Sequence, residues 1–227
     1  MKKSIFTIFA LLALLAFNTT SRAGTYYVVS GEPFSLAPAS GSTSFFQYLW
    51  TLDPGTGQVI RTLDQASGGV LTHTFGDGTA TSASLHKITL GVLTALDGCL
   101  SEVVEHTIIV LPKLTVSITA DKENFCSNAA VNSKLTATVS AATGLDTYGV
   151  TLSPFAWKLG SNAVDGQTSS VLNVTAPGTY SALVTYVLPT TGSFIPTASK
   201  IAGAIVGGTK QILNNLPLPT APAITLN

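Results

Sequence analysis

Three histidines and one Gly-Asp-Gly segment are the first candidates for metal chemistry in this sequence. His73, His86 and His106 each stand alone in a strand-like run, without a second ligand at metal-binding spacing. The segment Gly76-Asp77-Gly78 lacks the further Asp, Asn and Glu residues of a calcium loop. We therefore expect a tight turn there, no metal site, and histidines that are satisfied by neighbours or face solvent.

The usual patterns of enzyme active sites are also missing. The sequence has no G-x-S-x-G elbow and no Ser, His and Asp set that spacing would single out. Glycoside cleavage needs two acids that face each other across a groove. The acidic residues here are few and fall mostly in expected turns. We expect no catalytic site and no cofactor.

The elements that would position any site have a period of two residues, which is typical of β-strands. Alternating or β-branched runs recur along the whole chain, and Gly, Pro and Asp-Gly turn signals separate them. The nearest approach to a helix is "SKIAGAIVGG", and its glycines argue against one. About a dozen short strands at this spacing predict an all-β chain of two β-sandwiches.

The chain divides into four expected parts. Residues 1–23 form the first part, and the two sandwiches cover 24–112 and 113–213, with the joint at Leu111-Pro112-Lys113. Residues 214–227 form a Pro-rich linker and an extended C-terminal strand. Each expected sandwich has one Trp in an early strand, Trp50 and Trp157, where a sandwich core holds its large aromatic side chain.

A tyrosine corner is expected in the second sandwich. In "APGTYSALVTY", Tyr180 follows a turn directly and begins a long strand. At such a position the Tyr hydroxyl bonds back to the backbone of the preceding connection.

With these motifs, the second half resembles the Ig-like repeats found in tandem in large surface and secreted proteins of Bacteroidota-type bacteria. The resemblance is carried by "KLTATVS", "FAWKLGSNAVDGQTSSVLNVTAPGTYSALVTY" and their spacing. The first half, with "YLWTL", "FGDGTATS" and "LDGC", resembles the related PKD-like modules. The resemblance implies two tandem Ig/PKD-like β-sandwiches, a fold that hosts many functions. "PLPTAPAIT" is similar to the linker and first strand that open a further repeat, yet the sequence stops there.

The N-terminal part has the pattern of a secretory signal peptide. A basic start, Lys2 and Lys3, precedes the apolar run "IFTIFALLALLAF" and the small-residue site at Ser21-Arg22-Ala23. We expect cleavage between Ala23 and Gly24. The run is too short to span a bilayer, so a secreted, extracellular or cell-surface protein without a membrane span is expected.

Charge is scarce in the sequence. Only 10% of the residues are charged, and the 11 basic and 11 acidic side chains balance. Removal of Lys2, Lys3 and Arg22 leaves 8 basic side chains against the same 11 acidic ones, a net charge of about −3. Nucleic acid is excluded as a partner because it calls for clustered Lys and Arg. A mostly uncharged, Thr-rich surface suits packing against copies of the same protein or against a solid, and it is also common in secreted β-domains.

Cys99 and Cys126 are the disulfide candidates, because export permits such a bond. A bond between them would join the two expected sandwiches across a loop of about 27 residues and contribute about 3 kcal/mol on the chain-entropy model. Two free thiols, or a bond of each cysteine to a neighbouring subunit, are the alternatives, and the sequence leaves all three open.

Aromatic residues could form a platform that stacks on sugars. Strand alternation places Phe46, Tyr48 and Trp50 on the core face of one expected strand, which leaves Phe45 on the opposite face. Tyr26 and Tyr27 are further platform candidates. This thin platform makes a carbohydrate-binding module of a secreted degradation system the alternative function.

The C-terminal segment supports the principal hypothesis, a secreted non-catalytic structural or adhesive subunit. Ile224 and Leu226 alternate with polar residues, as in a strand that one chain adds to the sheet edge of another. The short opening run "TYYVVSGEPF" is the expected acceptor. Such a contact is head-to-tail and builds filaments unless a ring closes. The expected partners are therefore copies of the protein itself or other cell-surface proteins, with polysaccharide as the alternative. A tail that is frayed or folded back on its own sandwich is equally compatible with the sequence.

Overall fold

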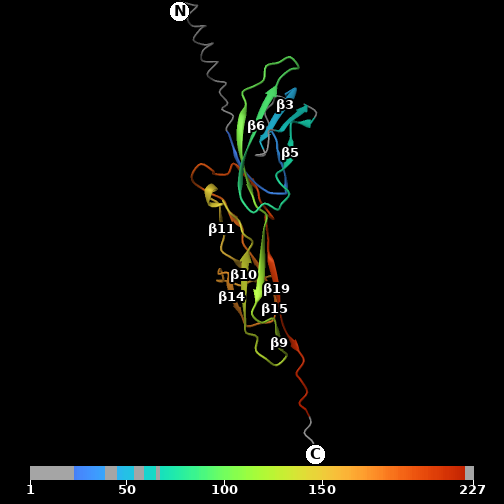
Figure 1. Ribbon diagram of the computed structural model, residues 1–227, viewed down its shortest axis with the longest axis vertical. Coiled ribbons are helices and arrows are strands. Elements are labelled where there is room, and N and C mark those ends of the chain that lie inside the picture. The colour runs from blue at the N-terminus through green and yellow to red at the C-terminus, as the bar shows by residue number, and fades with distance from the viewer. Residues whose placement is uncertain (1–22, 39–44, 54–58, 65–66, 223–227) are drawn as a thin grey trace, which may run out of the picture. The chain divides into compact units, whose positions relative to one another are not determined.

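The computed structural model describes residues 23–38, 45–53, 59–64 and 67–222, and nearly every element in these ranges is a β-strand (Figure 1). A 3-10 turn lies at Asp146–Tyr148. The predicted all-β fold class is confirmed. No helix in the described ranges is long and apolar enough to cross a membrane.

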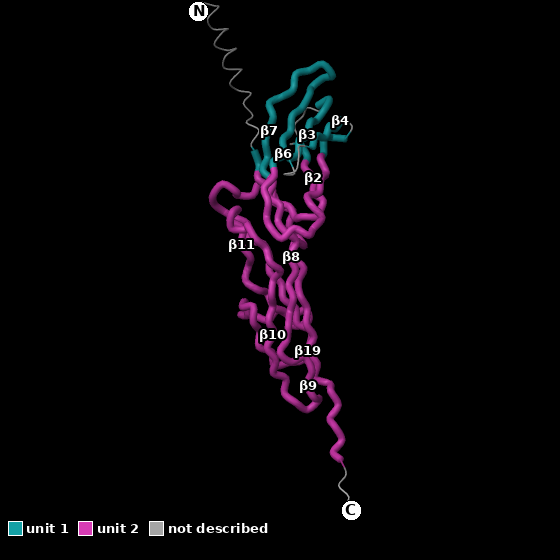
Figure 2. Tube along the Cα trace, in the orientation of Figure 1, with its two compact units in different colours: residues 1–24, 37–70, 87–107 teal, residues 25–36, 71–86, 108–227 magenta. Residues whose placement is uncertain are grey.

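The chain separates into two compact units, shown in teal and magenta in Figure 2. Unit 1 comprises Met1–Gly24, Ala37–Val70 and Lys87–Thr107. Unit 2 comprises Thr25–Leu36, Leu71–His86 and Ile108–Asn227. The sandwich boundaries proposed from the sequence stay a prediction.

Unit 1 is built on the central strand β3, and its strands have the following bounds. They are β3 (Gln47–Asp53), β4 (Val59–Asp64), most of β6 (Ser84–Leu93) and the first half of β7 (Val104–Leu111). Strand β3 pairs antiparallel with β4 on one side and with β6 on the other.

The core face of β3 carries Tyr48, Trp50 and Leu52, all buried, as its alternation predicts. The same alternation also places Phe46 on this face, which is wrong, because Phe46 precedes β3 and is exposed. The indole Nε1 of Trp50 donates a hydrogen bond to the Gly69 carbonyl at 2.9 Å, so the one polar atom of the ring is satisfied. Gly69 has a φ of 68°, and a Cβ atom there would lie 2.5 Å from the ring of Tyr48. A glycine is therefore required where this loop crosses the core face.

Unit 2 contains fifteen named strands besides the last residues of β7. They are β1 (Thr25–Val29), β2 (Pro33–Leu36), β5 (Leu71–Thr74), β8 (Leu114–Ala120), β9 (Asn124–Cys126), β10 (Ser133–Val139), β11 (Thr151–Leu152), β12 (Ala156–Leu159), β13 (Asn162–Ala163), β14 (Val171–Val174), β15 (Gly178–Leu183), β16 (Tyr186–Val187), β17 (Ala198–Lys200), β18 (Ile205–Val206) and β19 (Gly208–Leu216).

Two sheets of unit 2 form a sandwich. One has the order β14-β10-β8-β18 and the other the order β13-β12-β15-β19-β9. The sequence of strands in these sheets matches an immunoglobulin-type sandwich, with β8, β10 and β14 as strands A, B and E and with β12, β15 and β19 as strands C, F and G. Buried side chains from both sheets, such as Leu135 and Ile212, belong to one hydrophobic core.

The two aromatic landmarks of this sandwich lie where the sequence predicts them. Trp157 is buried on β12, and its Nε1 donates to the Ser169 carbonyl at 2.8 Å. Tyr180 is buried on β15, and its hydroxyl donates to the Ala176 carbonyl at 2.9 Å. The predicted tyrosine corner is therefore confirmed. The helix-like run "SKIAGAIVGG" forms β17, a turn and β18, as its glycines indicate.

Replacement of Tyr180 by Phe removes the corner hydrogen bond and keeps the ring. We expect Tyr180→Phe to lower the free energy of unfolding by about 1 kcal/mol, because the Ala176 carbonyl loses its partner. Urea unfolding followed by circular dichroism measures this change. A variant as stable as the wild type would show that the bond makes no net contribution.

Candidate functional site

Two of the three histidines lie around the ring of Phe75 in unit 2. The His86 ring stacks on the Phe75 ring with 4.5 Å between centroids, and its Nε2 is 3.1 Å from the Ser84 hydroxyl. The His73 ring meets the same Phe75 ring edge-on at 4.6 Å. These contacts give both imidazoles a packing role.

His106 belongs to unit 1 and accepts a hydrogen bond from the Gly24 amide on Nδ1 at 3.1 Å. Burial lowers the pKa of His106, which favours the neutral ring that this bond requires. Within the described ranges, no group of three or more His, Cys, Asp and Glu residues could hold a metal ion.

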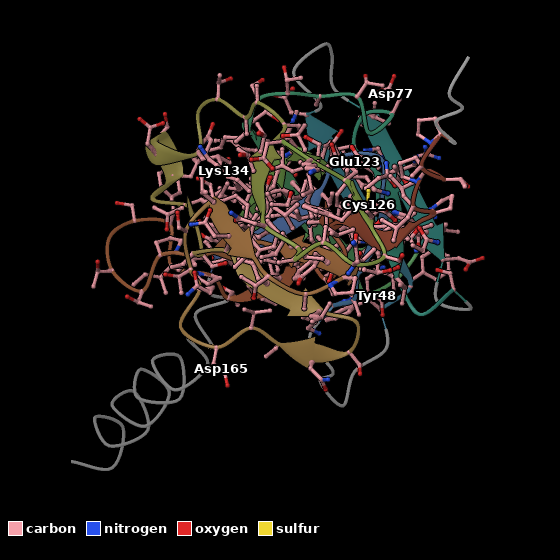
Figure 3. All side chains as sticks on the ribbon, turned by 90° about the horizontal axis from the view of Figure 1, so that it is seen from below. Tyr48, Asp77, Glu123, Cys126, Lys134 and Asp165 are labelled. Atoms are coloured by element: carbon pink, nitrogen blue, oxygen red, sulfur yellow. The ribbon has the colours of Figure 1, made fainter. Side chains whose placement is uncertain are left out.

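The Gly-Asp-Gly segment forms a turn closed by its own side chain (Figure 3). The Asp77 carboxylate accepts a hydrogen bond from the Thr79 amide at 3.0 Å and another from the Thr79 hydroxyl, and these bonds lower the pKa of Asp77. Gly76 and Gly78 have φ values of 64° and 84°, which a residue with a Cβ rarely adopts. The tight turn expected from the sequence is therefore present.

The two cysteines are free thiols in the structure. Cys99 is exposed and belongs to unit 1, whereas Cys126 is partly buried at the end of β9 in unit 2 (Figure 3). The pairing of Cys99 with Cys126 stays a prediction.

The residues of the candidate glycan platform have different environments. Tyr27 is fully buried in the core of unit 2, and its hydroxyl donates to the Phe194 carbonyl at 2.8 Å. A ring without an exposed face cannot stack on a sugar, so the assignment of Tyr27 to a platform is corrected. Tyr26 is half-buried in unit 2, and Phe45 is half-buried in unit 1, where it meets the Tyr48 ring edge-on at 5.8 Å.

Strand β1, the expected acceptor of a donated strand, has neighbours on both sides. Strand β7 lies along one side of it, and β17 pairs parallel with the other side over Tyr26–Ala198, Tyr27–Ser199 and Val28–Lys200. The Thr197 amide donates to the Thr25 carbonyl at 2.7 Å and extends this contact. The expectation that β1 is an open edge is therefore wrong, because a later segment of the same chain occupies it.

The sequence has little signal for β17. The segment around residues 194–200 has neither a strand-like alternation of apolar side chains nor a turn that would join it to β1. Its three strand residues are exposed, so burial leaves no mark on their composition.

The described part of the C-terminal tail is exposed and lies beyond the last strand. In Figure 1 the chain after β19 leads away from the neighbouring strand β9. Residues 215–222 are all exposed, including Leu216 and Leu218 at 43% and 52%. The Leu216 carbonyl still accepts a hydrogen bond from the Ser127 amide at 3.0 Å, and the residues after it belong to no strand. Ile224 and Leu226 lie outside the described residues.

Comparison with known proteins gives weak likenesses only. No protein-family model and no curated protein matches the chain. A crystal structure of the N-terminal four Ig domains of Dscam1 isoform 6.9 matches with 14% identity and a TM-score of 0.34, covering 87% of this chain and 45% of that chain. Structures of Clostridium thermocellum CbhA fibronectin(III)-like modules match with 13% identity and a TM-score of 0.36, covering 91% and 98%.

The chain spans just under half the length of the Dscam1 chains that it matches. At such low TM-scores neither likeness carries an argument about function. The class of the protein follows instead from its own strands: an all-β chain with an immunoglobulin-type sandwich in unit 2.

Two buried tyrosines predict a loss of stability in alkali. Burial raises the pKa of Tyr27 from 10.0 to about 12 and also raises the pKa of Tyr186, whose hydroxyl donates to the Pro112 carbonyl. The unfolded chain releases these protons near pH 10, before the folded chain does. The contribution to stability is thus complete below about pH 10 and decreases as the pH rises towards 12.

Between about pH 10 and 12 we expect the unfolding free energy to decrease less in the Tyr27→Phe variant than in the wild type. The two decreases are expected to differ by up to about 3 kcal/mol. Urea titrations at a series of pH values measure the slope. A variant with the same slope as the wild type would contradict the assignment of the effect to Tyr27.

Proposed function

We propose that this protein is an exported, non-catalytic structural or adhesive subunit that assembles head to tail by donating its C-terminal segment as a strand. The observation that carries the proposal is the exposed, uncharged tail beyond β19. Leu216, at the end of β19, and Leu218, in the tail, are both exposed, and an extended segment that becomes covered on assembly would bury them.

The spacing of the prolines suits an added strand. In an extended segment the backbone groups of alternate residues point to the same side, and proline has no N–H to donate. Pro217 and Pro219 therefore remove two donors from one side of the tail, and Pro222 removes one from the other side. Residues 223–227 contain no proline, so they keep all the backbone donors that an added strand needs.

The lead between β19 and the last five residues is long enough to reach another molecule. Residues 217–222 in an extended conformation span about 19 Å, at about 3.1 Å per residue. In the proposed assembly Ile224 and Leu226 are the side chains that enter the acceptor.

The surroundings of Gly24 support export with cleavage after Ala23. Ala23 is exposed, whereas Gly24 is buried. The Gly24 amide donates to His106, and its carbonyl accepts a hydrogen bond from the Thr107 amide at 2.9 Å. Of the two described residues that flank the expected cleavage bond, Gly24 is held by other residues of unit 1 and Ala23 is exposed, which supports cleavage between them.

Cleavage at this bond predicts the mass of the exported protein. Intact-mass spectrometry of the protein from the medium or cell surface of the producing cells is expected to give a chain that begins at Gly24. A chain that retains residues 1–23, or one that stays in the cytoplasm, would contradict export.

Loss of the tail is expected to abolish assembly without unfolding either unit. Light scattering and negative-stain electron microscopy of residues 24–227 are expected to show oligomers or filaments. Truncation after Pro217 keeps every described strand, including Leu216. That variant, and the double variant Ile224→Asp and Leu226→Asp, are expected to be monomeric with an unchanged thermal midpoint.

Two results would overturn the proposed assembly. Polymers that survive both changes would show that the tail is not the donor. A clean monomer of the unmodified chain would exclude self-assembly and direct attention to binding, with a glycan array as the next measurement.

A further inference from the structure

We infer that β4, at the edge of the unit 1 sheet, is the acceptor on which the donated tail of a second copy adds as a strand. The inference rests on the proposed function and specifies the partner surface. Because β17 occupies the side of β1 that the sequence favoured, the acceptor has to be another edge.

Strand β4 is the longest edge strand among the described residues. It has six residues. The other edge strands have two to four residues each: β17 in the same sheet, and β14, β18, β13, β9, β2, β5, β11 and β16 in the other sheets. An edge strand leaves every second pair of its backbone N–H and C=O groups without a ladder partner. A six-residue edge therefore offers about three such residues to an incoming strand.

Strand β4 lacks several of the usual protections of an edge. It contains neither proline nor glycine, and its register with β3 runs from Gln47–Asp64 to Leu52–Val59 without a bulge. The protection it does carry is one charge on the core face, Arg61, in register with Trp50. Ile60 is 61% exposed, and most of the strand faces water. A regular, exposed edge of this kind can accept an added strand.

The core face of β4 is incompletely covered. Register places Leu63 beside Tyr48, Arg61 beside Trp50 and Val59 beside Leu52. Whereas these three partners on β3 are buried, Val59 and Leu63 are half-buried and Arg61 is exposed. A strand added beyond β4 would extend this face, and its inward side chains would pack beside Val59 and Leu63.

The tail matches this face in polarity and spacing. Ile224 and Leu226 are two residues apart, so in a strand they point to the same side and meet two neighbouring positions of the face. Residues 211–227 carry no charge, and the charges of Arg61 and Asp64 on β4 cancel. Attraction between the two segments is therefore apolar and through the backbone, and the assembly is expected to persist on addition of salt.

The test uses the chain of residues 24–227 with Ile60→Lys and Thr62→Lys, which place two charges on the exposed edge strand. The matched control is Leu96→Lys, since Leu96 is 73% exposed in unit 1 and lies outside β4. We expect the β4 variant to lose the polymers at concentrations where the wild type and the Leu96→Lys control form them. All three chains are expected to have the same thermal midpoint.

Hydrogen exchange gives a second readout that does not depend on a substitution. In polymers of the unmodified chain, amides of residues 59–64 are expected to exchange more slowly than in the monomer truncated after Pro217. Two outcomes would overturn the assignment of β4 as the acceptor but not strand donation itself. In one, the amides that exchange more slowly in the polymer belong to another strand. In the other, the β4 variant still forms polymers. Loss of polymers in the Leu96→Lys control as well would also overturn the assignment of β4. Absence of polymers from the unmodified chain would defeat the proposed function itself.

Discussion

The core of unit 2 depends on a satisfied carbonyl at the turn between β7 and β8. The Tyr186 hydroxyl donates to the Pro112 carbonyl at 2.8 Å in a buried position. An unpaired carbonyl there would cost the free energy of its lost hydration. With the bond in place, Leu111 and Leu114, on either side of this turn, can both be buried in the same hydrophobic core. Residues of β1, such as Tyr27, join the same core, so strands from both halves of the sequence share one set of contacts.

Local features of this fold could be predicted from the sequence because the forces that determine them act over short distances along the chain. Alternation sets which face of β3 carries Trp50, and the turn before β15 places the Tyr180 hydroxyl near the Ala176 carbonyl, four residues away. The strand runs "TYYVV" and "LTVSITA" coincide with β1 and β8. In each case a period of two residues and a flanking turn are enough to predict the strand and the face on which its side chains lie.

Contacts between distant segments could not be predicted in the same way. The β1–β17 pairing is parallel and joins Tyr27 to Ser199, and exposed polar residues on β17 carry no mark of it. The adjacent residues Tyr26 and Tyr27 point to opposite faces, and the sequence does not say which ring is buried. The assignment of Tyr27 to a sugar platform is wrong, and so is the assignment of β1 to an open edge. Both errors arise because contacts between distant segments decide the burial of Tyr27 and the neighbours of β1. For the proposed assembly, the sequence suggests the donor segment, whereas an acceptor can be proposed only once the edges of the sheets are known.

The parallel pairing of β17 with β1 has a consequence for the order of events during synthesis. Strand β1 is completed on one side by residues 198–200, so that the chain has to be synthesised at least as far as Lys200 before that side of β1 can close. Contacts between residues so far apart in sequence carry a large loop-closure cost and form slowly. Until then the nascent chain presents an open β1 edge, and any factor that keeps such chains apart would act in that interval.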